Sequence, residues 1–376
     1  MVIKNGTVFQ ENGVFMQKSL YIDGTRIAEH STGKELDASG MYVIPGLIDI
    51  HFHGCVGYDF CDGTKEALHS IAEYQLMHGI TSICPASMTF EEVVLAQIFS
   101  NAAQYDNKEG AALIGINMEG PFISMEKKGA QNGAFIHKPD VEMFQRLQEK
   151  AAGMIRLVDI APEMDGAMSC IEALADQVVI SLAHTAADYA TAAEAFQKGA
   201  RHVTHLYNGM TSFSHREPGV IGAACDNQKV MVELICDGIH SHPATVRTTF
   251  KMFGDDRIVL ISDSMRACGL EDGQYTLGGQ DVTVKGKLAV LTENGTIAGS
   301  VTNLMECMKN AVQTMQIPFA SAVKCATVNP AKAIGIFDQY GSLTPGKYAD
   351  MVLLDQNLEI QYIIKSGEIV YSAKLK

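Results

Sequence analysis

The stretch from Val43 to Asp59 reads VIPGLIDIHFHGCVGYD, and it combines a buried-strand pattern with two side chains that can bind a metal. Its apolar run leads into His51 and His53. Residues two apart in an extended strand point to the same face, so both imidazoles project the same way. The glycines that follow mark the point where the chain turns away from the strand. Taken alone, this spacing is more often a chance surface pair than a metal site, so the interpretation depends on the rest of the chain.

The composition predicts a globular protein with one large domain and one small domain. The chain has 376 residues, of which 47% are apolar and 19% charged, enough for a sizeable core. It has neither the apolar segment of a signal peptide nor a run of about 18 apolar residues, so we expect a cytoplasmic location and no membrane partner. The nine cysteines include no CxxC pair, which indicates reduced core residues. A net charge of -14 argues against nucleic acid as a partner and requires local cations around any anionic ligand.

Short β segments are expected at both ends of the chain. Residues 1–44 contain Asn-Gly and Asp-Gly pairs between alternating segments, which are strong hairpin signals. Residues 341–376 return to short β segments. We therefore expect 1–44 and 341–376 to combine in a small β-sandwich domain beside a larger catalytic domain, 45–340.

From Gly46 the pattern changes to apolar runs of strand length, each followed by a longer stretch that includes helical periodicity. Runs rich in Val, Ile and Leu are typical of parallel strands that are buried on both faces. Eight such runs occur: Gly46–His53, Ile80–Ser87, Leu113–Glu119, Met154–Pro162, Val178–His184, His202–His205, Val230–Asp237 and Arg257–Asp263. Helices are expected at Lys65–His78, Glu91–Tyr105, Asp188–Lys198, Ser300–Met315 and Ala320–Ile334. The pattern predicts an α/β fold, a TIM (β/α)8 barrel with a β-hairpin insertion around 272–298.

Polar side chains stand at the carboxyl ends of these expected strands, which converge on one face of a barrel. They are His51, His53, Glu119, His184, His205 and Asp263. Imidazoles and carboxylates with an open position for water suit a borderline divalent metal such as zinc or iron. The alternative is a set of unrelated core histidines, which would bury several polar groups without a shared partner. The pattern favours a metal centre.

These residues lie in motifs that resemble the N-acetylglucosamine-6-phosphate deacetylase family of the amidohydrolase superfamily. The motifs are IPGLIDIHFHG, NMEGPF, SLAHT, VTHLYNGM, HREPGVIG, DGIH, ISDSM, ATVNPAKAIG and GSLTPGKYADMVLLD. The resemblance implies hydrolysis of the acetamido group of N-acetylglucosamine 6-phosphate to glucosamine 6-phosphate and acetate, with one or two divalent ions per subunit. It implies that Glu119, His184 and His205 bind the principal ion and that His51 and His53 bind a second one. It assigns Asp263 as the general base and acid.

The resemblance also implies a set of substrate-binding residues and a homodimer. Asn208, the Gly209 backbone, Arg216 and His240 match positions that hold the sugar phosphate, with Arg216 reaching the neighbouring subunit's site. Further contacts are implied for Ala130, Gln131, Ile297, Ala298, Gly299 and Ser300. The alternative for Arg216 is an ordinary surface ion pair with Glu217. Gln131 stands where some family members have His, and because an amide carries no charge, an acid role at that position is open.

Two other hypotheses remain after the sequence is considered. One is a different amidohydrolase, such as a cyclic amidase or a deaminase. Many binuclear members bridge their metals with a carbamylated lysine at the end of strand four, but Leu157–Glu163 (LVDIAPE) has no lysine, and Glu119 is available instead. The other is a non-catalytic phosphosugar sensor, which needs Arg216 and Asn208 but has no use for Asp263 as a proton shuttle. The presence of both residue sets favours the enzyme.

Overall fold

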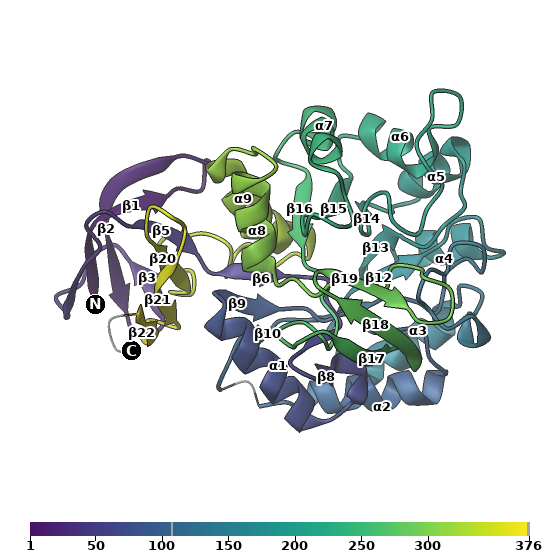
Figure 1. Cartoon of the computed structure of the whole chain (residues 1–376), viewed down its shortest axis with the longest axis horizontal. Coiled ribbons are helices and arrows are strands. Elements are labelled where there is room, and N and C mark those ends of the chain that lie inside the picture. Colours follow the sequence, from purple (N-terminus) through teal and green to yellow (C-terminus); the bar gives the residue numbers. More distant parts are fainter. Residues whose placement is uncertain (107, 374–376) are drawn as a thin grey trace.

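The structure is a computed structural model that describes residues 1–106 and 108–373. Figure 1 shows the strands of both chain ends gathered on one side, next to a larger body of strands and helices. Among the described residues, no helix has the length and apolar character needed to cross a membrane.

The larger body is built around a curled parallel sheet. Its strands are β6 (Leu47–Asp49), β9 (Ile80–Ile83), β10 (Ala112–Leu113), β11 (Ile116–Met118), β12 (Ile155–Ile160), β13 (Val179–Leu182), β14 (His202–Val203), β15 (Met231–Ile235) and β16 (Ile258–Ile261). They form two sheets in the orders β10-β9-β6 and β11-β12-β13-β14-β15-β16. Each of the eight expected runs contains a parallel strand, and β10 and β11 share one run. The nearly unbroken apolar runs fit this arrangement because both faces of the strands are covered.

Backbone contacts connect the two parallel sheets at both of their margins. An isolated parallel bridge joins Ala86, after β9, to Asn117 in β11. On the other side, the Asp263 N–H, after β16, donates to the His51 carbonyl at 2.9 Å, after β6. These contacts bring the segments that follow the first and last strands side by side.

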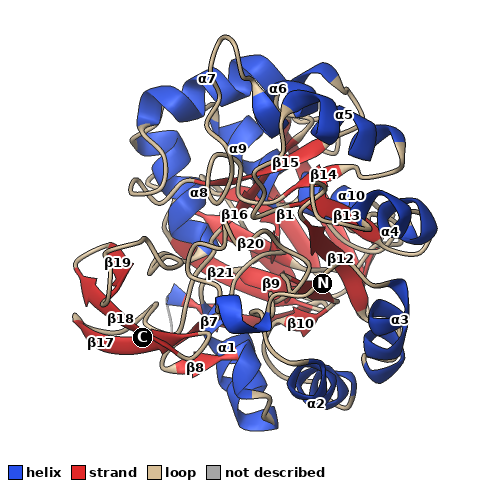
Figure 2. Ribbon diagram, turned by 90° about the vertical axis from the view of Figure 1, so that its right-hand side faces the viewer, coloured by secondary structure: helices blue, strands red, loops and turns tan. Residues whose placement is uncertain are grey.

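Helices cover the outside of the curled sheet, as Figure 2 shows. They are α1 (Lys65–Met77), α2 (Glu92–Ala103), α3 (Val141–Lys150), α4 (Ala167–Leu174), α5 (Tyr189–Gln197), α6 (Gly219–Asp226), α7 (Pro243–Phe253), α8 (Leu304–Gln313), α9 (Phe319–Ala326) and α10 (Val328–Ala333), with short 3-10 turns at η1 (Phe60–Asp62) and η2 (Gly133–Phe135). Side-chain caps mark several starts; Thr64, for example, accepts from the Ala67 N–H at the start of α1. The expected helix Ala320–Ile334 is instead divided at Thr327. Pro330 accounts for the break because its ring would clash with the carbonyl of Ala326 in a continuous helix.

The two ends of the chain share one eight-stranded sheet. Its members are β1 (Val2–Phe9), β2 (Phe15–Asp23), β3 (Arg26–Ala28), β4 (Glu35–Asp37), β5 (Tyr42–Pro45), β20 (Met351–Leu354), β21 (Ile360–Lys365) and β22 (Glu368–Ser372). β5 pairs antiparallel with β20, so N-terminal and C-terminal segments lie side by side. Because only Gly46 separates β5 from β6, the terminal sheet leads directly into the first parallel strand.

Two small antiparallel sheets lie on the loops after the parallel strands. β7 (Gly54–Cys55) and β8 (Tyr58–Asp59) follow His53, and β17 (Gly273–Leu277), β18 (Gln280–Lys285) and β19 (Leu288–Leu291) follow Asp263. The second sheet has one strand more than the hairpin expected around 272–298. Gln280 in β18 donates to the Ala130 carbonyl, which ties this sheet to the loop after β11.

Candidate metal centre

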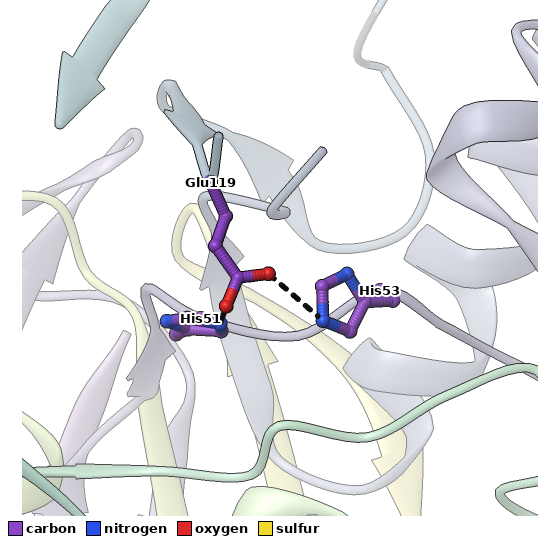
Figure 3. A group of neighbouring side chains, drawn as sticks. All are labelled: His51, His53 and Glu119. Carbon is purple, nitrogen blue, oxygen red and sulfur yellow. Dashed lines mark ion pairs between the residues drawn. The ribbon is translucent and has the colours of Figure 1, made fainter. Parts of the chain in front are cut away.

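The side chains predicted at strand ends gather at one face of the curled sheet. His51 and His53 follow β6, Glu119 follows β11, His184 follows β13, His205 follows β14 and Asp263 follows β16. All six are buried. Figure 3 shows His51 and His53 on either side of the Glu119 carboxylate.

Three of these residues adopt an uncommon backbone conformation. His184, His205 and Asp263 have φ angles of +42°, +29° and +48°. For a residue with a side chain, such a conformation costs on the order of 1–3 kcal/mol, and it persists where the surroundings over-determine it. The strain therefore coincides with the strand ends at which the polar groups converge.

The Glu119 carboxylate is the centre of the cluster. Its Oε1 lies 3.0 Å from His184 Nε2, 3.1 Å from His205 Nε2 and 3.4 Å from His51 Nε2. Its Oε2 lies 3.4 Å from His53 Nε2. His53 Nε2 also lies 3.2 Å from Asp263 Oδ1. Four imidazole nitrogens thus converge on one carboxylate, with a second carboxylate beside them.

The other nitrogen of each ring, Nδ1, faces an oxygen atom. The partners are Glu233 Oε2 at 3.0 Å for His51, the Ala86 carbonyl at 3.2 Å for His53, the Lys127 carbonyl at 2.8 Å for His184 and the Asn208 carbonyl at 3.1 Å for His205. Carbonyl and carboxylate oxygens only accept, so a neutral ring carries its proton on Nδ1 and presents the lone pair of Nε2 to Glu119.

This arrangement fits a bound cation. Lone pairs that face a carboxylate at these distances repel one another unless positive charge lies between them. His51 Nε2 and Asp263 Oδ1 are buried and have no hydrogen-bond partner among the described residues. The ligand atoms form two groups compact enough for a metal ion, namely His51, His53 and Glu119, and Glu119, His184 and His205. Glu119 belongs to both groups.

Electrostatics keep the two carboxylates of the cluster ionised. Burial is the largest influence on the Glu119 pKa and would raise it, but the facing histidines outweigh burial and hold that pKa well below its usual range. Burial likewise acts to raise the pKa of Asp263, but the neighbouring His53 and His51 outweigh burial and lower that pKa. The cluster therefore concentrates negative charge that a cation would balance.

The centre opens into a cavity of about 260 Å³. Most of the residues predicted to contact substrate line it, together with His53, Glu119, His184, His205 and Asp263: these are Ala130, Gln131, Asn208, Gly209, His240, Ile297 and Gly299. Met88, Leu277 and Thr296 also line the cavity, although sequence reasoning did not select them. His51 does not line the cavity, since it is fully buried beneath the cluster.

Three predicted substrate residues lie outside the cavity lining. Ala298 and Ser300 are buried in its wall, and the Ser300 hydroxyl donates to the Ser262 carbonyl at 2.6 Å. Arg216 is exposed on the loop before α6. Within residues 1–106 and 108–373, Arg216 forms no ion pair, so the alternative of a surface ion pair with Glu217 is not observed there.

Gln131 uses both ends of its amide within the protein. Its Nε2 donates to Glu119 Oε2 at 2.8 Å, and its Oε1 accepts from the Thr89 N–H at 2.7 Å. The side chain is buried. In this geometry Gln131 supports the shared carboxylate.

His240 is supported by an aspartate that sequence reasoning missed. Its Nδ1 lies 2.7 Å from Asp237 Oδ2, while Asp237 Oδ1 accepts the N–H groups of Ile239 and His240. Burial acts to lower the His240 pKa, but the hydrogen bond and charge of Asp237 outweigh it and raise that pKa. The cavity that Asn208 and Gly209 line is therefore also lined by a side chain that can carry positive charge.

Comparison with known proteins gives consistent matches along the whole chain. The profile of the Amidohydrolase family matches residues 42–370. The N-acetylglucosamine-6-phosphate deacetylase of Bacillus subtilis (strain 168) is 38% identical over 388 residues, which cover 100% of this chain and 98% of that protein. The N-acetylgalactosamine-6-phosphate deacetylase of Escherichia coli O157:H7 is 34% identical over 328 residues and covers 86% of each chain.

A solved structure is similar over the same extent. It is a variant of N-acetyl-D-glucosamine-6-phosphate deacetylase from Mycobacterium smegmatis in complex with N-acetyl-D-glucosamine-6-phosphate. The TM-score is 0.91 at 30% sequence identity, and the alignment covers 99% of both chains.

Proposed function

The chain belongs to the amidohydrolase family, and from that premise we propose that it hydrolyses the acetamido group of N-acetylglucosamine 6-phosphate to glucosamine 6-phosphate and acetate. The observation that carries the proposal is the convergence of four imidazole Nε2 atoms on Glu119 beside a cavity lined by Asp263. The similarity to the N-acetylglucosamine-6-phosphate deacetylases of Bacillus subtilis and Mycobacterium smegmatis supports the choice of substrate.

We assign the principal divalent ion, zinc or iron, to Glu119, His184 and His205, and a second ion to His51 and His53. The two compact ligand groups that share Glu119 support this assignment. A bound divalent ion supplies Lewis acidity, which lowers the pKa of a water molecule and polarises an amide carbonyl. The protein fixes the ligand rings through their Nδ1 contacts, so that little rearrangement is needed on binding.

Asp263 is the proposed general base and acid. Its carboxylate lines the cavity, is held ionised and has one oxygen without a hydrogen-bond partner among the described residues. Amide hydrolysis requires a proton to move from the attacking water to the leaving amine. A carboxylate in this position can accept that proton and then deliver it to the amine nitrogen.

The phosphosugar is assigned to the rest of the cavity lining. Asn208, the Gly209 backbone and His240 hold the phosphate, with contacts from the loops that carry Ala130, Gln131 and Ile297–Ser300. The raised pKa of His240 supports this role because a cation is needed to hold an anion on a chain of charge -14. Arg216 is exposed and does not line the cavity of its own chain, which suits donation to the neighbouring subunit of a homodimer.

The finer architecture belongs to the same proposal. We propose that the curled sheet closes as a (β/α)8 barrel across 45–340, and the contacts Ala86–Asn117 and Asp263–His51 support this closure. We assign segments 1–44 and 341–376 to the small β-sandwich domain; the structure describes 1–44 and 341–373 of these, and an apolar core around Ile3, Leu20 and Leu353 supports the assignment. A cytoplasmic location suits the substrate and the free cysteines.

The proposal is tested by measuring acetate release together with metal content. We expect acetate from N-acetylglucosamine 6-phosphate, and a kcat/KM on the order of 10²-fold lower for unphosphorylated N-acetylglucosamine, because charge-assisted hydrogen bonds contribute about 1.5–3 kcal/mol each. N-acetylgalactosamine 6-phosphate, the sugar in the name of the Escherichia coli relative, is the third substrate to compare. A higher kcat/KM for N-acetylgalactosamine 6-phosphate than for N-acetylglucosamine 6-phosphate would assign the former as the substrate. Tight binding of the phosphosugar without acetate release would indicate a sensor.

The catalytic assignment is tested with Asp263→Asn. This substitution keeps the shape of the side chain and removes its basicity. We expect kcat to fall by about 10²–10⁴-fold, the range typical of general acid-base groups, with metal still bound. A variant within a few-fold of wild type would remove Asp263 from the mechanism.

A further inference from the structure

Glu233 is a buried carboxylate that the mechanism above does not use. It lies in the middle of β15, with no exposed surface, within the apolar run VELI. A charged side chain in the interior of a parallel strand is unfavourable unless it is hydrogen-bonded. Its partners therefore indicate why the side chain is there.

One oxygen of Glu233 contacts both ligand groups of the metal centre. Glu233 Oε2 lies 3.0 Å from His51 Nδ1 and accepts from the His205 backbone N–H at 3.1 Å. His51 belongs to the group His51, His53 and Glu119, while His205 belongs to the other group. Glu119 joins the two groups through the Nε2 atoms of the rings, whereas Glu233 connects Nδ1 of the His51 ring to the backbone of His205.

The contact with His51 differs in kind from the corresponding contacts of the other three ligand rings. His53, His184 and His205 each direct Nδ1 at a backbone carbonyl. Those three rings keep their partners whatever side chains surround them. The orientation of His51 depends on one replaceable and charged side chain.

A competing donor makes this dependence stronger. Asn117 Nδ2 lies 3.4 Å from His51 Nδ1, and it also donates to the Ile50 carbonyl at 3.2 Å. Without Glu233, the Asn117 amide would be the partner that remains at His51 Nδ1. Because this amide is a donor, the ring proton would move to Nε2 and occupy the lone pair that binds the metal. With Glu233 present, the shorter contact to a carboxylate holds the proton on Nδ1.

We propose that Glu233 is a positioning residue that keeps the Nε2 lone pair of His51 free, so that the His51–His53 half of the centre binds a second divalent ion. This inference rests on the metal centre of the proposed function. The principal half depends on Glu233 less, because the His205 ring has its own partner in the Asn208 carbonyl and Glu233 meets only its backbone N–H.

Two substitutions separate the contributions of shape and charge. In Glu233→Gln, the amide oxygen can still accept from His51 and His205, so the geometry remains and the charge is lost. In Glu233→Leu, no acceptor remains. Loss of a group that orients a metal ligand lowers metal affinity by about 10–100-fold. We expect zinc affinity to fall by an amount near the lower end of this range in Glu233→Gln and near the upper end in Glu233→Leu. Only the weaker of the two zinc affinities should change.

The measurement is a zinc titration of the metal-free protein against a competing chelator, with zinc per subunit counted after gel filtration. Wild type is expected to retain two ions per subunit and Glu233→Leu one. The matched control is Asp159→Asn. Asp159 is a fully buried acid in β12 that accepts a hydrogen bond at 2.9 Å from the hydroxyl of Thr204, a residue that is not a metal ligand. We expect this control to retain both ions.

The outcomes distinguish this inference from the proposed function. A wild-type protein that binds no ion would overturn the proposed function. One that binds a single ion at saturating zinc would overturn the inference about Glu233 and the assignment of a second ion to His51 and His53, while the principal ion and the deacetylase activity would stand. Two unchanged affinities in both Glu233 variants, or equal weakening of both affinities, would also overturn it.

A second measurement needs no variant and covers the case in which the substitutions prevent folding. The ¹⁵N chemical shifts of the imidazoles in ¹⁵N-histidine-labelled metal-free protein report which nitrogen carries the proton. At a pH at which the ring is neutral, we expect His51 to be protonated on Nδ1 in wild type. A neutral His51 with its proton on Nε2 would show that Glu233 does not set the tautomer.

Discussion

Gly209→Ala should disturb the metal centre through a single added methyl group. Gly209 lies in the loop after β14 and has a φ angle of +59°. An added Cβ would stand 2.8 Å from His184 Nδ1 and 3.2 Å from its Cε1, whereas ordinary contacts begin at 3.4 Å. The same Nδ1 donates to the Lys127 carbonyl at 2.8 Å, so the ring cannot turn away without losing that bond.

The size of the effect follows from these distances. The ring must move by about 0.6 Å to restore ordinary contact, which exceeds the tolerance of about 0.5 Å within which a catalytic geometry must be held. Misplacement on the order of 1 Å lowers rates by about 10²-fold. The left-handed conformation adds roughly 1–2 kcal/mol for alanine. We therefore expect a fall in kcat/KM approaching 10²-fold, weaker metal binding and a lower Tm.

The matched control is Gly286→Ala, because Gly286 has the same φ of +59° and an added Cβ there would meet nothing within 4 Å. In both variants, the left-handed backbone conformation of the new alanine should lower Tm by a similar amount. Only Gly209→Ala should lose acetate release and metal content, measured on the same preparations. Equal activity and equal metal content in the two variants would refute the argument that close approach to His184 requires glycine at 209.

Three further predictions address the ligands, the phosphate and the subunit contact. His205→Ala should lose the principal ion and activity, and full zinc content by elemental analysis would remove His205 from the ligand set. Arg216→Ala should raise KM for the phosphorylated sugar by at least about 10-fold while the slow reaction of N-acetylglucosamine stays unchanged. Equal effects on both sugars would contradict a phosphate contact. Mixing the Arg216→Ala and Asp263→Asn proteins should restore part of the activity if subunits exchange. Because Asp237 raises the pKa of His240, the charge of His240 is present below that raised pKa and is lost as pH rises through it. In Asp237→Asn, the rise of KM with pH should therefore begin at lower pH, and an unchanged pH profile would contradict this coupling.

The sequence predicts the parallel strands and the residues at their ends because both depend on local patterns. Runs of apolar residues identify buried strands. The spacing of His51 and His53 correctly predicts that both face one site, although β6 ends at Asp49 and neither histidine lies in the expected strand. Glu233 was missed for the opposite reason. It lies within an apolar run, and its partner His51 is 182 positions away, a pairing that only the curled sheet creates. The sequence does contain one signal for Glu233, which is an acidic residue within an apolar run. An acid in a strand that is buried on both faces needs a partner.

The same distinction explains the substrate residues. The loop that carries Gln131 and the loop that carries Asn208 and Gly209 reach the cavity because each directly follows a strand. Gln131 reads as a substrate residue from its motif, yet both ends of its amide are occupied by Glu119 and the Thr89 N–H. These two hydrogen bonds depend on side-chain geometry, which no spacing rule contains.

The buried charges of the metal centre make metal binding dependent on pH. Burial alone would raise the pKa values of Glu119, Glu233 and Asp263, yet all three are lowered, and the pKa values of His51 and His53 are raised. The same buried positions can therefore be balanced either by protons on the imidazoles or by divalent ions between Nε2 and the carboxylates. Because a protonated Nε2 has no lone pair, protons and metal compete for the same atoms. Metal binding must then release protons, and metal affinity must fall as the pH falls, so the buried acids that favour cation binding also make it dependent on pH.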